Sequence, residues 1–320
     1  MYFQASIAAV NVPLISSSSF DTPNSGNDTS FQLTRPTFVT GAASGKSEWE
    51  TPKHPPIGIG EQTAYALANY GITKLAITDI NLRDLEAVAA NVQRQWPGVE
   101  VMPLELDVSK PEQAKSVLSQ VVERFGRLDI AVNNAGVTGR AGQVNDELDE
   151  AEQMDELDEA DWSKVLSTNL RGIHFCQQEE LHIMKDQEDL GPPRGRGSII
   201  NVSSLHGLIK LLYSIQYTAS AAAKYDADVI GITRADAVSH SGFNIRIKAI
   251  CPGYIETPTT GSSAQSQMEN RSLDEHVKET PLRRLGQPEE IADGVVFLAS
   301  SLSSSVNGFG LAVNGGYSCV

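Results

Sequence analysis

The chain has 320 residues, a formal net charge of −15 and a hydrophobic content of 40%. Its length is enough to bury the core of one large α/β domain. Its acidity argues against nucleic acid and membrane surfaces as partners, because both attract clustered Lys and Arg. The cysteines Cys176, Cys251 and Cys319 are far apart and fit neither a disulfide framework nor a zinc site. We therefore expect a cytoplasmic protein with a small-molecule partner and no metal.

The chain divides into a short leader and one domain. Ser16–Ser30 is rich in Ser, Asn, Asp, Thr and Gly, which predicts a flexible N-terminal leader over residues 1–30, and residues 31–320 are expected to form a single domain. From Pro36 onward, short β-branched runs alternate with longer amphipathic stretches. This pattern predicts an α/β fold, a doubly wound Rossmann-like parallel sheet of about seven strands with helices on both faces.

The predicted strands are Thr37–Thr40, Lys74–Thr78, Val99–Leu104, Asp129–Val132, Ser198–Val202, Arg246–Ile250 and Gly310–Val313. The predicted helices are Glu61–Tyr70, Leu82–Gln95, Pro111–Phe125, Glu159–Met184, Tyr217–Ser239 and Pro288–Ser300.

A glycine-rich turn follows the first strand in two separated parts. The first part is Thr40-Gly41-Ala42-Ala43-Ser44-Gly45 and the second is Gly58-Ile59-Gly60; without an insertion of about thirteen residues near 46–58 they fuse to T-G-A-A-S-G-I-G. Such glycines permit positive φ and let backbone N–H groups reach a pyrophosphate at the following helix. A retained intron is one hypothesis for the insertion. Gly45-Lys46-Ser47 also resembles the end of a triphosphate-binding loop, but the spacing from Gly41 is one residue too short.

Asp79 ends the second predicted strand, where a carboxylate accepts hydrogen bonds from the adenosine ribose. No basic residue follows it directly, so NAD(H) is favoured over NADP(H). Arg83 and Lys46 are close enough in sequence to keep NADP(H) open. Asp79 is alternatively a helix N-cap in the turn Asp79-Ile80-Asn81.

Together these features resemble the short-chain dehydrogenase/reductase family, in its single-domain form similar to 3-oxoacyl-ACP reductases and specialised-metabolite reductases. The resemblance spans about Thr37–Ser318. Its further motifs are Asp107-Val108, Asn133-Asn134-Ala135-Gly136, Asn169, Ser203-Ser204, Tyr217, Pro252-Gly253, Thr257 and Asn314-Gly315-Gly316. The family implies an NAD(P)-dependent oxidoreductase that forms a homodimer or homotetramer.

The resemblance also implies individual roles for residues in this chain. Asp107 would contact adenine, Asn133–Gly136 would support the fourth strand beside the cofactor, and Ile255 with Thr257 would hold the carboxamide. The full set expected to bind cofactor is Thr40, Gly41, Ser44, Gly45, Ile59, Gly60, Asp79, Asp107, Val108, Asn134, Ala135, Gly136, Tyr217, Lys224, Pro252, Gly253, Ile255 and Thr257.

The expected catalytic group is Ser204, Tyr217, Lys224 and Asn169. Hydride transfer leaves charge on the substrate oxygen, so the site needs a proton donor and acceptor, here Tyr217, and a second hydrogen-bonding group, here Ser204 thirteen residues earlier. A phenol with a pKa near 10 improves as a base beside a cation. The family places a lysine four residues after the tyrosine, and Asn169 in a water relay to it.

In this chain the position four residues after Tyr217 is Ala221, and the next lysine is Lys224. On an unbroken helix Lys224 would share nearly the same face as Tyr217 but lie roughly 10 Å along the axis, against roughly 6 Å for the usual spacing. Its stem could reach back, or the alanines could bulge out and restore the contact. Both alternatives remain open for an insertion placed near 221–226.

Two further observations bear on specificity and activity. A D-E-L-D-E-A repeat begins at Asp146 and again at Asp155, inside a third insertion near 141–160, and its acidic residues suggest a solvated surface. Substrate recognition is expected after Ser204, in a lid from Tyr254 to Asp274, and in Asp186–Arg196. The expected substrate is a small secondary alcohol or ketone, from secondary metabolism or 3-oxoacyl-like. The alternative is a redox-silent member that binds a substrate or assists a non-redox cyclisation or isomerisation.

Overall fold

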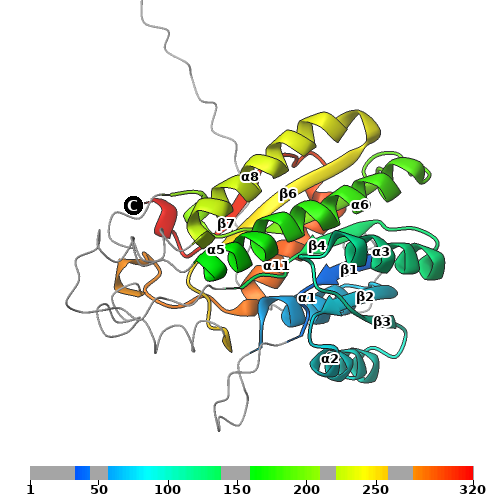
Figure 1. Cartoon of the computed structure of the whole chain (residues 1–320), viewed down its shortest axis with the longest axis horizontal. Helices are drawn as coiled ribbons and strands as arrows, with labels where there is room; N and C mark the ends of the chain where they lie inside the picture. Colours follow the sequence, from blue (N-terminus) through cyan, green and yellow to red (C-terminus); the bar gives the residue numbers. More distant parts are fainter. Residues whose placement is uncertain (1–32, 44–56, 138–158, 210–220, 259–276, 320) are drawn as a thin grey trace, which may run out of the picture.

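The computed structural model describes residues 33–43, 57–137, 159–209, 221–258 and 277–319. Its centre is a seven-stranded parallel sheet in the order β3-β2-β1-β4-β5-β6-β7 (Figure 1). The strands are β1 (Thr37–Thr40), β2 (Lys74–Asp79), β3 (Glu100–Glu105), β4 (Ile130–Asn133), β5 (Gly197–Val202), β6 (Ile245–Pro252) and β7 (Gly310–Val313). The chain order reverses between β1 and β4, the place where parallel sheets of this kind bind ligands. The predicted doubly wound fold is confirmed.

Helices cover both faces of the sheet. On one face lie α1 (Ile59–Asn69), α2 (Leu82–Gln95) and α11 (Pro288–Ala299), and on the other α3 (Pro111–Phe125), α6 (Ile173–Asp186) and α8 (Ala221–His240). Local signals fix several ends: the Asn81 side chain accepts from Asp84 N at the start of α2, and Gly126 (φ 84°) ends α3. The predicted bounds of α2 and α3 are confirmed. Over the described ranges, no helix has the length and apolar character needed to cross a membrane.

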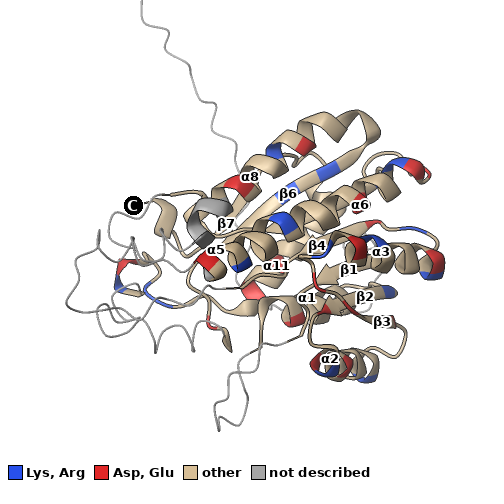
Figure 2. Ribbon diagram, viewed as in Figure 1, with Lys and Arg blue, Asp and Glu red and all other residues tan. Residues whose placement is uncertain are grey.

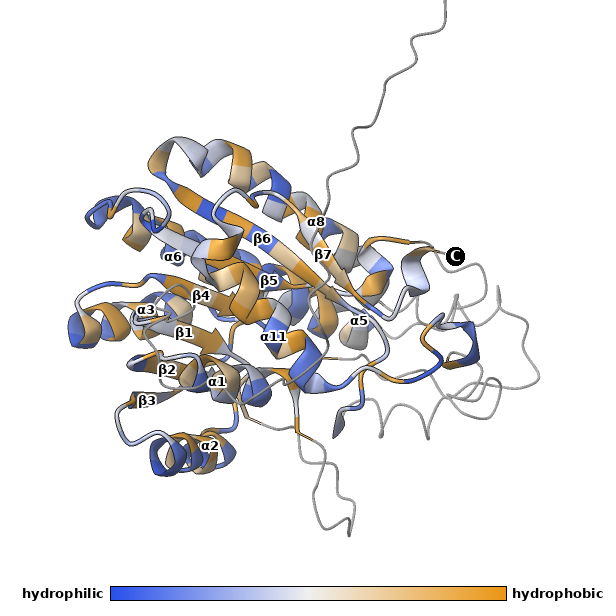
Figure 3. Cartoon of the chain, turned by 180° about the vertical axis from the view of Figure 1, so that it is seen from behind, coloured by the Kyte–Doolittle hydropathy of each residue, from blue (hydrophilic) through white to orange (hydrophobic). Residues whose placement is uncertain are grey.

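The core lies between the sheet and its helices. All four residues of β1 and of β4 are buried, and the strands form an apolar band through the middle of the molecule in Figure 3. This agrees with the near-continuous apolar runs of strands that helices cover on both sides. Strand β6 is an exception, since blue marks basic residues on its ribbon in Figure 2, and Lys248 is one of the residues of this strand. Lys248 is fully buried and donates to Ser198 Oγ (3.0 Å) and Leu298 O (2.5 Å).

The predicted single helix Glu159–Met184 is wrong in its middle. The structure has α5 (Glu159–Val165), then a π-helical segment from Leu166 to Gly172, then α6. The wider turn brings Asn169 to the chain after β4, where its Oδ1 accepts from Val137 N (2.8 Å) and its Nδ2 donates to Val137 O (2.9 Å). Such π segments are frequent at functional sites.

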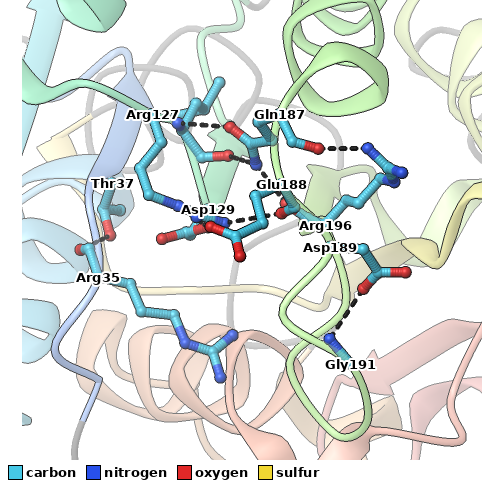
Figure 4. Close-up of polar contacts among 10 residues, drawn as sticks. Arg35, Thr37, Arg127, Asp129, Gln187, Glu188, Asp189, Gly191 and Arg196 are labelled. Atoms are coloured by element: carbon cyan, nitrogen blue, oxygen red, sulfur yellow. Dashed lines mark hydrogen bonds and ion pairs between the residues drawn. The ribbon is translucent and has the colours of Figure 1, made fainter.

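The segment Asp186–Arg196 does not lie near the expected substrate site. It precedes β5, whereas Ser204 follows β5, so the two are at opposite edges of the parallel sheet. In Figure 4 the segment packs on the start of β4: Gln187 Nε2 donates to Leu128 O (2.7 Å), beside an Arg127–Asp129 ion pair of 2.7 Å. The expectation that this segment shapes substrate recognition is therefore wrong.

A buried polar network joins β4, β5, α6 and α8 beneath the carboxyl edge of the sheet. Asn133 Nδ2 donates both to Asn201 Oδ1 (3.0 Å) and to Glu180 Oε2 (3.1 Å), and Asn201 Nδ2 donates to Thr233 Oγ1 (2.9 Å). Glu180 is fully buried, and no Lys or Arg in the described part of the chain shifts the pKa of its carboxyl. Burial raises the pKa of its carboxyl to about 8, opposed by the hydrogen bond from Asn133. Near neutral pH the network holds an uncharged carboxylic acid.

This burial predicts a pH-dependent effect of Glu180→Gln on stability. Because the pKa of Glu180 is higher in the folded state, folding must keep a proton that the unfolded chain releases above about pH 4.5. The wild type should lose stability relative to Glu180→Gln as pH rises from 4.5 to about 8. Each pKa unit is worth about 1.4 kcal/mol. Between pH 4.5 and pH 7 the free energy of unfolding of the wild type should therefore fall by on the order of 3 kcal/mol relative to Glu180→Gln.

Denaturant unfolding from pH 4.5 to 8.5 measures this difference, with Glu123→Gln on the exposed side of α3 as the control. A constant offset between wild type and Glu180→Gln across the pH range would show that Glu180 is not held neutral.

Candidate active site

The two parts of the glycine turn meet in the structure. Gly41 has φ +65°, and a Cβ built on it would lie 2.7 Å from Ala135 Cα. A Cβ built on Gly60 would lie 2.0 Å from Gly41 O, closer than any side chain can approach. The second half of the turn therefore packs on the first although an insertion separates them in sequence. Ser44 and Gly45, also expected to bind cofactor, lie outside the described residues.

Thr40 fixes this turn to the end of β4. Its Oγ1 accepts from Asn134 N (2.9 Å) and Ala135 N (3.0 Å). In return, Asn134 Nδ2 donates to Thr40 O (3.1 Å) and Gly41 O (3.0 Å). The ends of β1 and β4 are thus tied side by side at the point where the strand order reverses, and Gly136 continues from there toward the Asn169 amide.

Helix α1 begins directly after the turn, with Ile59 as its first residue. Its N-cap is Gly58, which has no side chain to bond the first-turn N–H groups. Those donors point out of a helix N-terminus beside two closely packed glycines, an arrangement suited to an anionic group such as a phosphate.

Asp79 ends β2 next to this turn. Its Oδ2 accepts from Ala43 N (3.0 Å) and its Oδ1 from Asn81 N (3.0 Å). Desolvation raises the pKa of the Asp79 carboxyl, and these backbone hydrogen bonds oppose the shift. The cap of α2 is Asn81, so the alternative reading of Asp79 as the N-cap is wrong.

Asp107 and Val108 follow β3 on the other side of β2. Asp107 Oδ1 accepts from Ser109 N (3.0 Å) and Ser109 Oγ (2.6 Å), which holds its carboxylate in place. Val108 is buried against Gly172, where an added Cβ would lie 2.7 Å from Val108 Cγ2. Val108 also lines a small hollow with Thr40 and Ala135, so these expected cofactor contacts are brought together.

Ser204 follows β5 and caps a one-turn 3-10 helix, Leu205–Gly207. Its Oγ lies 2.9 Å from His206 Nδ1 and accepts from His206 N at 3.3 Å. The His206 ring stands edge-on to Tyr254, with ring centroids 6.4 Å apart. His206 is not among the residues expected from the sequence. The signal that points to it is a Ser-x-His spacing in a tight turn, where capping brings the two side chains together.

The expected residues after β6 lie at the same edge of the sheet. Pro252 ends β6, and Gly253 N donates to Val313 O (3.0 Å). A Cβ on Gly253 would lie 2.7 Å from Asn314 Cα, so the backbones of the two chain segments touch. Ile255 is buried and pairs with Gly286, and it lines a cavity of about 40 Å³ with Tyr254 and Asn314, among others. Thr257 follows two residues later, half-buried.

The expected tyrosine and lysine are placed less fully. Tyr217 lies outside the described residues. Lys224 lies in α8, whose described backbone is helical from Ala221 to His240. Because Tyr217–Ser220 lie outside the described residues, both alternatives for how Lys224 meets Tyr217 stay predictions.

Comparisons with known proteins agree with this arrangement. The profile of a family described as enoyl-(acyl carrier protein) reductase matches residues 56–318. A 3-oxoacyl-(acyl-carrier-protein) reductase of Thermotoga maritima is 34% identical over 279 residues, covering 87% of this chain and 96% of its own. Levodione reductase of Leifsonia aquatica is 35% identical over 264 residues, covering 82% of this chain and 90% of its own.

A crystal structure of levodione reductase superposes with a TM-score of 0.75 at 30% identity, covering 90% of this chain and 99% of its own. A structure of NAD+-bound xylitol dehydrogenase gives a TM-score of 0.73 at 26% identity, covering 89% of this chain and 99% of its own. Cyclohexanol dehydrogenase of Acinetobacter sp. is 32% identical, covering 81% of this chain and 90% of its own. The glycine turn, the strand ends and these matches together show that the chain belongs to the short-chain dehydrogenase/reductase family of oxidoreductases.

Proposed function

We propose that this protein interconverts a secondary alcohol and a ketone of a small molecule with NAD(H) as cofactor. The observation that supports it most directly is the close packing of Gly60 on Gly41. It places a glycine-lined turn and a helix N-terminus whose N-cap, Gly58, has no side chain at the switch point between β1 and β4. The residues present fit a dinucleotide: the turn would hold the pyrophosphate, Asp79 the ribose, and Asp107 with Val108 the adenine.

NAD(H) is favoured over NADP(H) by the surroundings of Asp79. Backbone N–H groups of Ala43 and Asn81 hold the two carboxylate oxygens in place, and a carboxylate has about four acceptor directions to share with a ribose hydroxyl. No described ion pair neutralises Asp79, so a 2′-phosphate there would meet an uncompensated negative charge.

The remaining residues serve the substrate oxygen. The bound nicotinamide would give or take the hydride. Ser204 at the end of β5 would hydrogen-bond the substrate oxygen, Tyr217 would exchange its proton, and Lys224 with Asn169 would support that exchange less directly. The alternative is a redox-silent protein, since the lysine is displaced in sequence from its usual place four residues after Tyr217.

For the substrate we propose a carbocyclic secondary alcohol or ketone. Two relatives are named for six-membered ring alcohols, cyclohexanol dehydrogenase and cis-4-hydroxycyclohexanecarboxylate dehydrogenase, the latter 31% identical over 291 residues. We further propose a single domain from residue 31 with a leader, a cytoplasmic location and assembly as a homodimer or homotetramer.

The test is reduction of cyclohexanone and oxidation of cyclohexanol by the purified chain, followed by NADH absorbance. Turnover that Ser204→Ala lowers about 100-fold would support the proposal. If the protein binds NADH and reduces a 3-oxoacyl thioester but not cyclohexanone, the proposal of a carbocyclic substrate is overturned. Binding without turnover of either ketone would favour the redox-silent alternative, and absence of binding would overturn the cofactor assignment.

Gly60→Ala should weaken NADH binding. Its methyl group would collide with Gly41 O at 2.0 Å, so the turn must open before the helix can keep its place. We expect at least a 30-fold rise in the NADH dissociation constant, measured by calorimetry. Gly98→Ala is the matched control, because a Cβ there meets nothing within 4 Å. Equal NADH affinity in the two variants would contradict the placement of the pyrophosphate.

Asp79→Asn should change cofactor preference. The amide keeps an oxygen for a backbone N–H but removes the charge that would repel a 2′-phosphate, and about 1.4 kcal/mol of relieved repulsion is a tenfold change. We expect the ratio of NADPH to NADH dissociation constants to fall about tenfold. Glu123→Gln removes the same charge far from the turn and should leave the ratio unchanged; an unchanged ratio in Asp79→Asn as well would refute the role of Asp79.

A further inference from the structure

We propose that His206 is the acid–base partner of Ser204, and that protonation of its Nδ1 decides whether the Ser204 hydroxyl donates or accepts at the substrate oxygen. This inference rests on the proposed function. It starts from one contact, the 2.9 Å separation of Ser204 Oγ and His206 Nδ1.

The hydrogens at this contact allow two states. Ser204 has one hydroxyl hydrogen, and its oxygen already accepts from His206 N at 3.3 Å. If Nδ1 has no proton, the serine hydrogen points at it and the hydroxyl has nothing left to donate to a substrate. If Nδ1 has a proton, the ring donates to Oγ and the serine hydrogen is free to turn toward the substrate oxygen.

In the ketone-reducing direction the second state completes the chemistry. As the hydride electron pair forms the new C–H bond, the carbonyl π bond breaks and its electrons move to oxygen. That oxygen takes the Ser204 hydrogen, and Ser204 takes the proton from His206 Nδ1. His206 is left neutral and regains one proton from water, so each turnover consumes one hydride and one proton. In alcohol oxidation the steps are reversed: His206 Nδ1 starts without a proton, Ser204 gives its proton to Nδ1, and Ser204 takes the proton of the substrate hydroxyl.

The surroundings of His206 keep its ring in position. The side chain is 9% exposed and its ring stands edge-on to Tyr254. Tyr254 packs edge-on against Tyr317 with centroids 5.4 Å apart, and Tyr317 Oη donates to Glu279 Oε2 at 2.9 Å. Such aromatic contacts favour one ring orientation over free rotation.

Few of the described groups near the Leu205–Gly207 turn could change charge together with His206. The ionisable or charged groups are Tyr254, Tyr317, Glu279 and the buried thiol of Cys251 on β6. Among the α8 residues whose side chains the structure describes, from 227 to 240, the buried residues Val229, Ile230 and Thr233 have no ionisable group. Imidazole is the side chain whose unperturbed charge changes between pH 5 and 8, so a rate that depends on proton transfer through the Ser204–His206 contact should depend on pH in this range.

Proton transfer between Ser204 and His206 also suits a site in which the lysine is displaced along the sequence. In the sequence, Ala221 stands where the family has its cation, and the next lysine is Lys224. A phenol without a nearby cation is a poor proton carrier near neutral pH. A serine backed by an imidazole provides a second route for the same proton.

The test compares His206→Asn and His206→Phe with wild type. Asn offers an oxygen near the Nδ1 position that accepts from Ser204 but holds no titrating proton, and Phe keeps the ring contact with Tyr254. We expect the wild-type kcat for cyclohexanone reduction at saturating NADH to fall as pH rises from 5 to 8. Both variants should lose about 100-fold in kcat at pH 6 and lose this pH dependence, with the NADH dissociation constant unchanged within about twofold.

Loss of rate with an unchanged pH profile would reduce His206 to a structural residue, and a wild-type profile in His206→Asn would overturn the relay outright. A readout without turnover separates this inference from the proposed function. In ¹⁵N NMR, Ser204→Ala should shift the imidazole pKa and the Nδ1/Nε2 tautomer balance of His206, even in a chain that reduces no ketone. Identical His206 spectra in wild type and Ser204→Ala would refute the contact itself.

Discussion

The short hydrogen-bonded clasp between Thr40 and Asn134 is the constraint on which the rest of the site depends. One hydroxyl accepts two backbone N–H groups from the end of β4, and one amide returns two hydrogen bonds to the end of β1. This fixes the two strands at the switch point. It also places Ala135 so close to Gly41 that a larger residue could not occupy that position.

A second set of contacts extends from the clasp to the substrate side. Asn133, one residue before the clasp, bonds Asn201 on β5, and Asn201 bonds Thr233 on α8. Val137, three residues after it, is held by Asn169 of the π-helical segment. The strand that precedes Ser204 and the helix that follows it are therefore positioned by the same polar layer, which contains the neutral acid Glu180.

Sequence reasoning recovered the sheet and the residues at its carboxyl edge because both depend on local pattern. The strand runs and the bounds of α2 and α3 follow from periodicity, caps and turn residues. The π-helical segment was not predictable, since its wider turn is stabilised by a distant partner, Val137. Asp186–Arg196 was misplaced although strand direction alone assigns it to the amino edge. His206 was overlooked because it matches no family motif, and its importance appears only in the distance to Ser204.

The two-part glycine turn has a consequence for how such a site tolerates change in its chain. Gly41 is located by Ala135, and Gly60 by the carbonyl of Gly41 and the Asn134 side chain. Each half is anchored by tertiary neighbours, so the covalent path between them does not set their geometry. The length of that path is then limited mainly by loop-closure entropy, which grows slowly with length. In this fold the two halves of the glycine turn are each held by contacts with other parts of the protein. Residues can therefore be inserted between the two halves while these contacts are kept.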